Sequence, residues 1–243
     1  MENNNSVENL LTREELQIQL ERSNSALQQV EAEIKIEAAL EQVRASGMAM
    51  QKSEELAQSA NVLFQQMESL GIPAWSTGYC IWADDKLSGT YWMSSMGILQ
   101  PPFTAPMTEN SMFMHCREAC LGGETFYAEE FSGNELEKHY QYMGDLPSVK
   151  DMLDKITVAG VEVPSFPLSQ VNHNVYFSKG FLLFVTLKPV PEAHEIFKRF
   201  GKVFDQTYTR FLDLQKAEAQ ARESEIQLAL ERVRARTMAV YTD

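Results

Sequence analysis

Residues 165–188 read SFPLSQVNHNVYFSKGFLLFVTLK and divide into two extended segments joined at the tripeptide Ser-Lys-Gly. The first segment, 165–177, is strand-like. The second, 179–188, is almost wholly apolar, which is typical of a strand buried within a sheet. We therefore expect both segments to lie in a central β-sheet.

Two more strands are expected earlier in the chain. Segments 75–82 and 89–96 are rich in Tyr, Trp, Ile and Met with a period near two, and Asp84, Asp85 and Lys86 separate them. This pattern predicts a β-hairpin. Between the two strand pairs we expect a helix over 108–121, a strand over 125–131, and a helical segment over 132–155 that Pro147 interrupts.

Helices are predicted on both sides of this sheet region. An apolar stripe runs over 56–70 and ends at Gly71, a typical helix stop. After Pro191 the sequence predicts a long helix whose aromatic stripe can cover the sheet. The stripe consists of Phe197, Phe200, Phe204, Tyr208 and Phe211.

A helical repeat encloses the sheet region. Ile36–Met50 (IEAALEQVRASGMAM) reappears 190 residues later as Ile226–Val240 (IQLALERVRARTMAV), with nine of fifteen positions identical. Both copies place apolar residues at four-three spacing, which predicts the seam of a helix dimer. The predicted seam residues are Ile36, Leu40, Val43, Ile226, Leu230 and Val233.

A second stripe precedes the first copy. It comprises Leu16, Leu20, Leu27, Val30 and Ile34, and its register shifts between Ile34 and Ile36. A register shift makes a helix pair rewind locally, and a pair with two near-equal packings can act as a switch. Plain structural packing explains the shift equally well.

Composition excludes several classes of protein. The net charge is −13 with no cluster of Lys and Arg, so we expect no nucleic-acid partner. Three cysteines give no even disulfide framework, and the polar start 1–12 lacks a signal-peptide core, so we expect a cytoplasmic protein. No apolar run approaches the roughly 18 residues that a membrane span needs.

The order of helices and strands over about 54–212 resembles the GAF domain family. Four short sequences are similar to those of a bacterial group in which tandem GAF-like modules precede sensor histidine kinases or nucleotide cyclases. They are ALEQVR and ALERVRARTMA in the two repeat copies, KSEEL at 52–56 and FDQTYTRF at 204–211. The resemblance implies an α+β fold in which a central antiparallel sheet is flanked by helices. It also implies coiled-coil signalling helices at 1–53 and 213–243.

The functional expectations follow from the same resemblance. It implies an input role in signal transduction, as in two-component systems, with a homodimer passing the signal to an output kinase or cyclase domain. We find no output domain in this sequence, so we expect the chain to belong to a longer protein.

The residues offer one candidate ligand pocket. Aromatic side chains on the predicted sheet can stack on a planar ligand, and two polar residues can supply contacts to it. Sheet-to-helix packing explains the aromatic residues equally well. The candidates are Trp75, Tyr79, Trp92, Tyr176, Arg117 and His173, and the sequence identifies no cofactor.

Catalysis is not expected. The sequence has no phosphoacceptor histidine context, no glycine-rich nucleotide lid and no nucleophile elbow. Two alternatives remain open. One is a structural coiled-coil protein with a ligand-free GAF-like spacer. The other is a metal or cofactor site at Cys116 and Cys120, which are four residues apart on a predicted helix, with help from His115 or His139.

Overall fold

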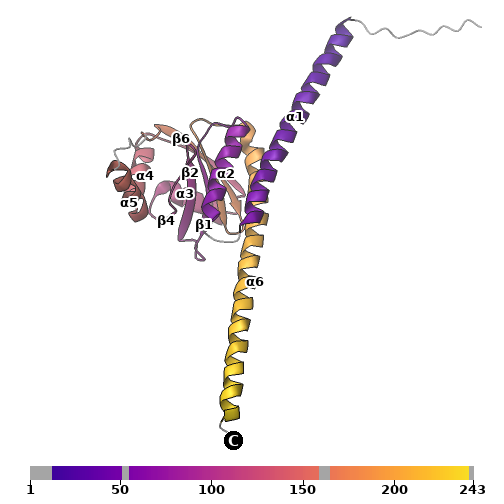
Figure 1. The fold of residues 1–243 in the computed structure, drawn as a ribbon. Coiled ribbons are helices and arrows are strands. Elements are labelled where there is room, and N and C mark those ends of the chain that lie inside the picture. The colour runs from indigo at the N-terminus through magenta and orange to yellow at the C-terminus, as the bar shows by residue number, and fades with distance from the viewer. Residues whose placement is uncertain (1–12, 51–54, 159–164, 241–243) are drawn as a thin grey trace, which may run out of the picture.

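The computed structural model describes residues 13–50, 55–158 and 165–240, which form an α+β domain with two long helical arms (Figure 1). In chain order the elements are α1 (Arg13–Ala49), α2 (Leu56–Ser69), β1 (Ala74–Trp82), β2 (Ser88–Ser95), β3 (Ile98–Leu99), β4 (Phe103–Pro106), α3 (Ser111–Leu121), β5 (Phe126–Ser132), α4 (Gly133–Asp145), α5 (Pro147–Val158), β6 (Ser169–Phe177), β7 (Gly180–Thr186), the 3₁₀ turn η2 (Pro191–Ala193) and α6 (His194–Val240).

The seven strands form one antiparallel sheet. Its order is β3-β2-β1-β7-β6-β5, and β4 pairs with β2. The two predicted strand pairs, β1–β2 and β6–β7, are confirmed, as are the helical segments and the break between α4 and α5 at Pro147. β3 and β4 were not predicted, because two-residue and four-residue strands beside a Pro-Pro dipeptide give no periodic signal.

Helices cover the two faces of the sheet in separate layers. On one face, α1, α2 and α6 enclose the larger core with Tyr79 and Phe184. On the other, α3, α4 and α5 enclose a second core with Cys80 and Phe181. Because successive side chains of a strand point to opposite faces, neighbouring residues of β1 and β7 belong to different cores.

The predicted aromatic stripe of α6 covers the sheet as expected. Phe197, Phe200 and Phe204 are buried, and the Phe197 ring stacks on Phe184 of β7 with ring centroids 4.3 Å apart. Buried aromatic side chains contribute several kcal/mol each, about 3–5 kcal/mol when truncated to alanine. The stripe therefore attaches the first half of α6 firmly to the domain.

α1 and α6 pack in parallel within one chain. Contacts join Glu33 to Arg199, Gly47 to Thr207 and Met48 to Arg210, so both helices run in the same direction (Figure 1). α1 projects from the domain at its N-terminal end and α6 at its C-terminal end. The domain therefore sits beside a rod that leaves it in two opposite directions.

The first half of the predicted dimer seam lies inside this chain. Leu40 and Val43 are each 3% exposed and belong to the core formed with α2 and α6, and Ile36 packs against that core. Side chains buried in this way have no surface to offer a second copy. The seam assignment of Leu40 and Val43 is therefore corrected: their apolar spacing serves intrachain packing, and the partly buried Ile36 packs on the same core.

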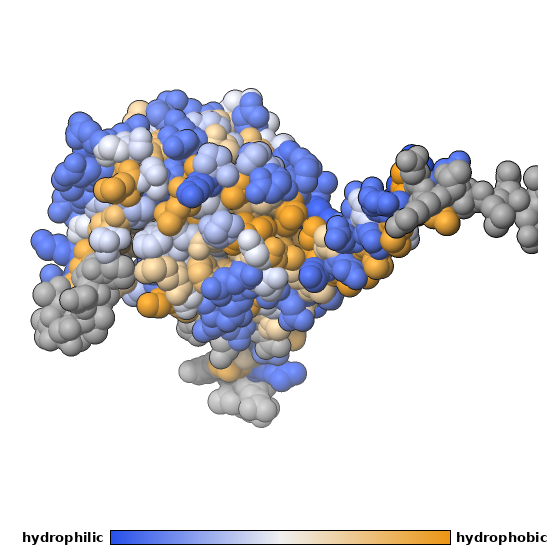
Figure 2. Space-filling view, turned by 90° about the horizontal axis from the view of Figure 1, so that it is seen from above, coloured by the Kyte–Doolittle hydropathy of each residue, from blue (hydrophilic) through white to orange (hydrophobic). Residues whose placement is uncertain are grey.

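The register shift in α1 marks the point where the helix leaves the domain. Ile36, Leu40 and Val43 face the core, whereas the earlier apolar residues are exposed: Leu16, Leu20, Leu27, Val30 and Ile34. Figure 2 shows apolar residues among polar ones along this N-terminal arm. The two stripes lie on different faces because they serve different neighbours.

Among the described residues, no helix has the length and apolar character that crossing a membrane requires.

Candidate functional site

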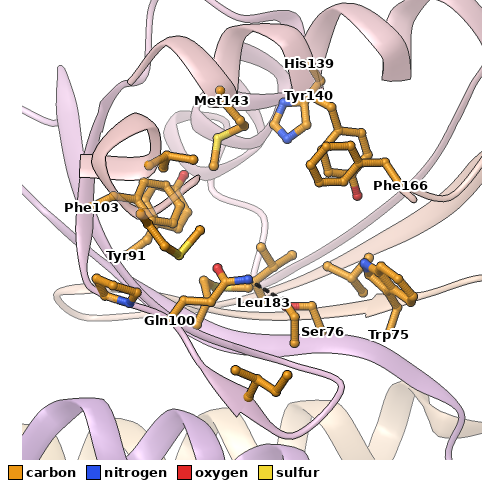
Figure 3. A pocket seen from close by; sticks show the side chains of 18 of the residues that line it. Trp75, Ser76, Tyr91, Gln100, Phe103, His139, Tyr140, Met143, Phe166 and Leu183 are labelled. Carbon is orange, nitrogen blue, oxygen red and sulfur yellow. Dashed lines mark hydrogen bonds between the residues drawn. The ribbon is translucent and has the colours of Figure 1, made fainter. Parts of the chain in front are cut away.

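A cavity of about 360 Å³ lies between the sheet and the helices α4 and α5 (Figure 3). Its volume falls within the range of ligand pockets, roughly 300–1,000 Å³. Most lining side chains are apolar or aromatic. They include Trp75, Tyr91, Met93, Leu99, Phe103, Phe113, Tyr140, Met143, Val149, Met152, Phe166, Leu183 and Val185.

A chain of hydrogen bonds lines the sheet side of the cavity. The Gln100 amide donates to the Ser95 hydroxyl at 2.9 Å, the Ser95 hydroxyl donates to that of Ser76 at 2.9 Å, and Ser76 donates to the backbone oxygen of Ser94 at 3.1 Å. The hydroxyl protons of Ser95 and Ser76 are both donated within this series of hydrogen bonds. Gln100 is therefore held in place against β1 and β2.

A second polar chain connects α4 to β6. The Tyr140 hydroxyl donates to the Gln170 amide oxygen, and the Gln170 amide nitrogen donates to Asn172 at 2.8 Å. The Tyr140 ring stacks on Phe166 with centroids 4.0 Å apart, and both rings border the cavity (Figure 3). These contacts fix one aromatic wall.

His139 brings a buried but neutral imidazole to the site. Its Nδ1 lies 2.9 Å from the amide oxygen of Asn110. Burial lowers the pKa of His139 to about 4, so the ring is neutral at pH 7. Because the amide oxygen can only accept, Nδ1 carries the proton and Nε2 is an acceptor.

The cavity lining carries no charge at neutral pH. Among the described residues, no Asp, Glu, Lys or Arg lines it, and its histidine is neutral. An ionised ligand buried there would lose its hydration without gaining a counter-charge, at a cost of several kcal/mol. The site therefore suits a neutral molecule that is mostly apolar and carries a few hydrogen-bonding groups.

Trp75 is the predicted pocket residue that the structure places in the cavity lining. Alternation along β1 assigns it to the same face as Tyr79, but the β1–β7 register shifts between Ala74 and Ser76. A bulge of this kind re-aims a side chain. The bulge explains why Trp75 borders the cavity together with its neighbour Ser76.

Three predicted pocket residues lie on the opposite face of the sheet, and their assignment is corrected. Tyr79 stacks on Trp92 at 5.3 Å and contacts Phe204 of α6 at 4.7 Å. His173 contacts Phe197 at 5.1 Å, and its Nε2 lies 3.0 Å from the Thr186 hydroxyl. All three pack in the core beneath the helices.

For Trp92 and His173, the predicted pocket residue is one position away from a residue that does line the cavity. Trp92 lies between Tyr91 and Met93, which line the cavity, and His173 follows Asn172, which also lines it. Sequence alternation shows that two faces exist but not which face is hollow.

Arg117 and Tyr176 lie outside the cavity lining, so their assignment as pocket residues is also corrected. The Arg117 Nε donates to the backbone oxygen of Lys86 at 2.8 Å. The Tyr176 hydroxyl donates to the backbone oxygen of Cys116 at 2.6 Å. Both side chains connect α3 to the sheet and act structurally.

Among the described residues, Cys116 and Cys120 have no additional side chains placed to complete a metal site. Burial raises the pKa of Cys116 to about 12, so its thiol stays protonated, whereas metals bind thiolates. His115 instead lies 3.1 Å from the Glu129 carboxylate. Within the described ranges, no group of three or more His, Cys, Asp or Glu residues is placed to hold a metal ion.

Comparison with known proteins adds no relative. No family model matches the sequence, and no curated protein matches it either.

Proposed function

We propose that this chain is a non-catalytic sensory module of bacterial signal transduction that binds a neutral, mostly apolar ligand in the cavity beside α4 and α5. Ligand binding changes the packing of the flanking helices, which pass the signal to an output kinase or cyclase domain in the cytoplasm. The observation that carries the proposal is a cavity with aromatic walls and, among the described residues, no charged lining side chain.

The ligand class follows from the walls. Trp75, Tyr140 and Phe166 offer flat apolar surfaces, and Gln100 and Asn172 offer amide groups at the sheet. Aromatic walls favour planar ligands, and a small number of amides fixes their orientation. A phosphorylated ligand such as a cyclic nucleotide would need a cation that the described lining does not supply.

A short hairpin connects the cavity to the helical face. Leu99 of β3 lines the cavity and also packs against the core beneath the helices. At the turn before it, Met96 and Gly97 have φ of 49° and 76°, and a Cβ on Gly97 would lie 3.7 Å from Phe64 of α2. A ligand that displaces Leu99 therefore pushes on a segment in contact with α2.

Polar contacts add to this connection across the sheet. Ser94 of β2 donates to the Asn61 side chain of α2 at 3.3 Å, and Thr77 of β1 donates to the backbone oxygen of Ala60 at 3.3 Å. A movement of β1 or β2 thus alters the position of α2, which in turn contacts α1.

The module acts as a homodimer in this proposal, joined through the N-terminal arm. Leu16, Leu20, Leu27, Val30 and Ile34 are each about half exposed or more and follow a coiled-coil-like spacing. An exposed stripe of this length on a solvated helix is stabilised when a second helix covers it.

A dye titration tests the ligand site. Nile red is neutral and planar, so its fluorescence should rise on binding the full chain with a stoichiometry near one. Met152→Trp fills the cavity from α5 and should weaken binding at least about tenfold. Met114→Trp, on the exposed side of α3, is the matched control and should bind as the parent does.

A failed titration has a defined meaning. If Met152→Trp and Met114→Trp bind the dye equally, the cavity is not the binding site. If neither the parent nor the control binds it and native mass spectrometry shows no retained small molecule, the structural role of a ligand-free spacer is favoured.

A further inference from the structure

The two copies of the helical repeat occupy different environments. The first copy, Ile36–Met50, packs on the groove between α2 and α6, with Ala39, Leu40 and Val43 buried. The second copy, Ile226–Val240, lies on the projecting half of α6 (Figure 1). The side chains described there are exposed.

The residues that make the first copy dock are retained in the second. Position by position, Ile36, Ala39, Leu40 and Val43 correspond to Ile226, Ala229, Leu230 and Val233. Ile226, Leu230 and Val233 are 47%, 46% and 62% exposed. An exposed helix that keeps four apolar contact residues in register has the face needed to dock on a groove of the same kind.

The changes between the copies fall largely on the solvent side. Glu37, Ala38, Gln42 and Ser46 of the first copy lie outside the buried set, and Gln227, Leu228, Arg232 and Arg236 replace them. Drift at these four positions, combined with identity at Ile36, Ala39, Leu40 and Val43, is the pattern of a maintained interface.

The polar rim is also repeated in part. Arg199 of α6 contacts Glu33, just before the first copy, and Glu37 within it, at 2.7 and 2.6 Å. The corresponding residues are Glu223, just before the second copy, and Gln227 within it, and the Gln227 amide donates to the Glu223 carboxylate at 2.9 Å. Both can accept hydrogen bonds from an arginine placed like Arg199.

Two buried positions differ, Gly47 and Met50, and the first of them restricts the groove that the second copy fits. A Cβ at Gly47 would lie 2.5 Å from the Thr207 Oγ1 and 2.6 Å from its Cβ. The Thr207 hydroxyl is held by the backbone oxygens of Val203 and Phe204. The second copy carries Thr237 at this position, so it cannot enter the groove of this chain without displacing backbone.

We propose that Ile226–Val240 is a docking helix for a second, non-identical sensor domain of the same architecture. That domain presents a groove between two helices equivalent to α2 and α6, with an arginine at the rim and a glycine where this chain has Thr207. The Thr207 contact excludes the groove of a second copy of this chain, and direct pairing of two second-copy helices is the outcome that the sedimentation experiment below tests. The proposal goes beyond ligand binding and does not depend on it.

Repeat exchange within the full chain tests the proposal. Replacing residues 36–50 by the sequence of 226–240 puts Thr at position 47, and this chain should melt at least about 8 °C below the parent. Adding Thr207→Gly should recover more than half of that loss, although Thr207→Gly alone lowers Tm, because glycine costs about 1 kcal/mol within a helix. Leu40→Asp, which places a charge in the buried α1 contact, gives the melting temperature expected when this contact is lost.

Two results would overturn the proposal. The first is an exchanged chain with Thr207→Gly that melts as low as Leu40→Asp, because the second copy would then be incompatible with such a groove. The second comes from sedimentation of the full chain carrying Leu230→Asp and Val233→Asp. These substitutions should leave its oligomeric state unchanged, and a loss of dimer would show that the second copy pairs with itself. Dye binding in the cavity is unaffected in either case.

Discussion

Arg199 of α6 donates a bidentate pair of hydrogen bonds to the carboxylate of Glu33 in α1, Nη2 to Oε1 at 2.7 Å and Nη1 to Oε2 at 3.1 Å. The two residues are 166 positions apart in the sequence. The same Nη2 reaches Glu37 one turn later, at 2.6 Å. A planar guanidinium fixes two carboxylates more specifically than an ammonium can. The contact therefore sets the axial position of α1 along α6, at the point where α1 leaves the domain.

Arg199→Lys should lower Tm only slightly, because the partners are exposed and such pairs contribute little to stability. The guanidinium holds the pKa of Glu33 below its usual range, mainly through the hydrogen bond. Thermal melts at low and high salt check this. The difference between parent and variant should shrink at 1 M NaCl, and a difference independent of salt would contradict an electrostatic role.

Gly47→Ala should destabilise the protein strongly, by about 2–4 kcal/mol, because the added Cβ meets the Thr207 side chain at 2.5 Å. Gly144→Ala in α4 is the matched control. Its Cβ would meet Leu153 at an ordinary 4.0 Å, so the substitution should stabilise by roughly 0.5–1 kcal/mol through the unfolded state. Urea unfolding of both variants makes the comparison, and equal effects would contradict the close α1–α6 contact.

Phe197→Ala should cost about 3–5 kcal/mol, since its buried ring stacks on Phe184 and packs beside His173. Leu168→Ala, at a side chain that is 91% exposed, should be neutral. The midpoint of urea denaturation measures both. A loss below 1 kcal/mol for Phe197→Ala would mean that α6 is not packed on the sheet in solution.

Stability should fall as the pH drops from about 6.5 to about 4. Burial lowers the pKa of both His139 and His173 to about 4, below the usual histidine value of 6.5. In this window the unfolded chain binds protons that the folded chain does not, so protonation favours unfolding. Above pH 6.5 both states are neutral at these rings, and stability should be level.

The variant His139→Gln isolates one of these rings. Its amide can still donate to Asn110, so folding is kept, but the buried titrating group is gone. Urea midpoints measured between pH 7 and pH 4.5 should fall less steeply than those of the parent. An unchanged slope would show that His139 does not titrate with folding.

Leu20→Lys combined with Leu27→Lys should dissociate the proposed homodimer without lowering the Tm of the domain. Both side chains are exposed on the N-terminal arm, 61% and 57%, so the fold does not depend on them. Gln28→Lys, beside the stripe, is the control. Sedimentation velocity measures the mass, and a parent that is already monomeric contradicts the dimer.

The alternation of strands and the spacing of helical stripes predicted five of the seven strands and the helix that covers the sheet. The apolar run at 179–188 becomes β7, buried on both faces, and the stripe from Phe197 to Phe211 covers the sheet. Local periodicity carries this information because it reports how many faces of an element are buried. Local periodicity does not report which face borders a cavity. For this reason the sequence predicts His173 as a pocket residue, although Asn172 is the residue that lines the cavity.

By itself, the sequence determined the order of the longer elements, the two strand pairs β1–β2 and β6–β7, the aromatic stripe of α6 and the helical repeat. Only the tertiary structure decided that Leu40 and Val43 are core residues of a single chain, and that the cavity opens on the face of Tyr91 and not of Trp92. The physical reason is that an apolar stripe indicates only that one face of a helix is stabilised by burial. Which surface meets that need depends on long-range packing, here between residues more than 160 positions apart.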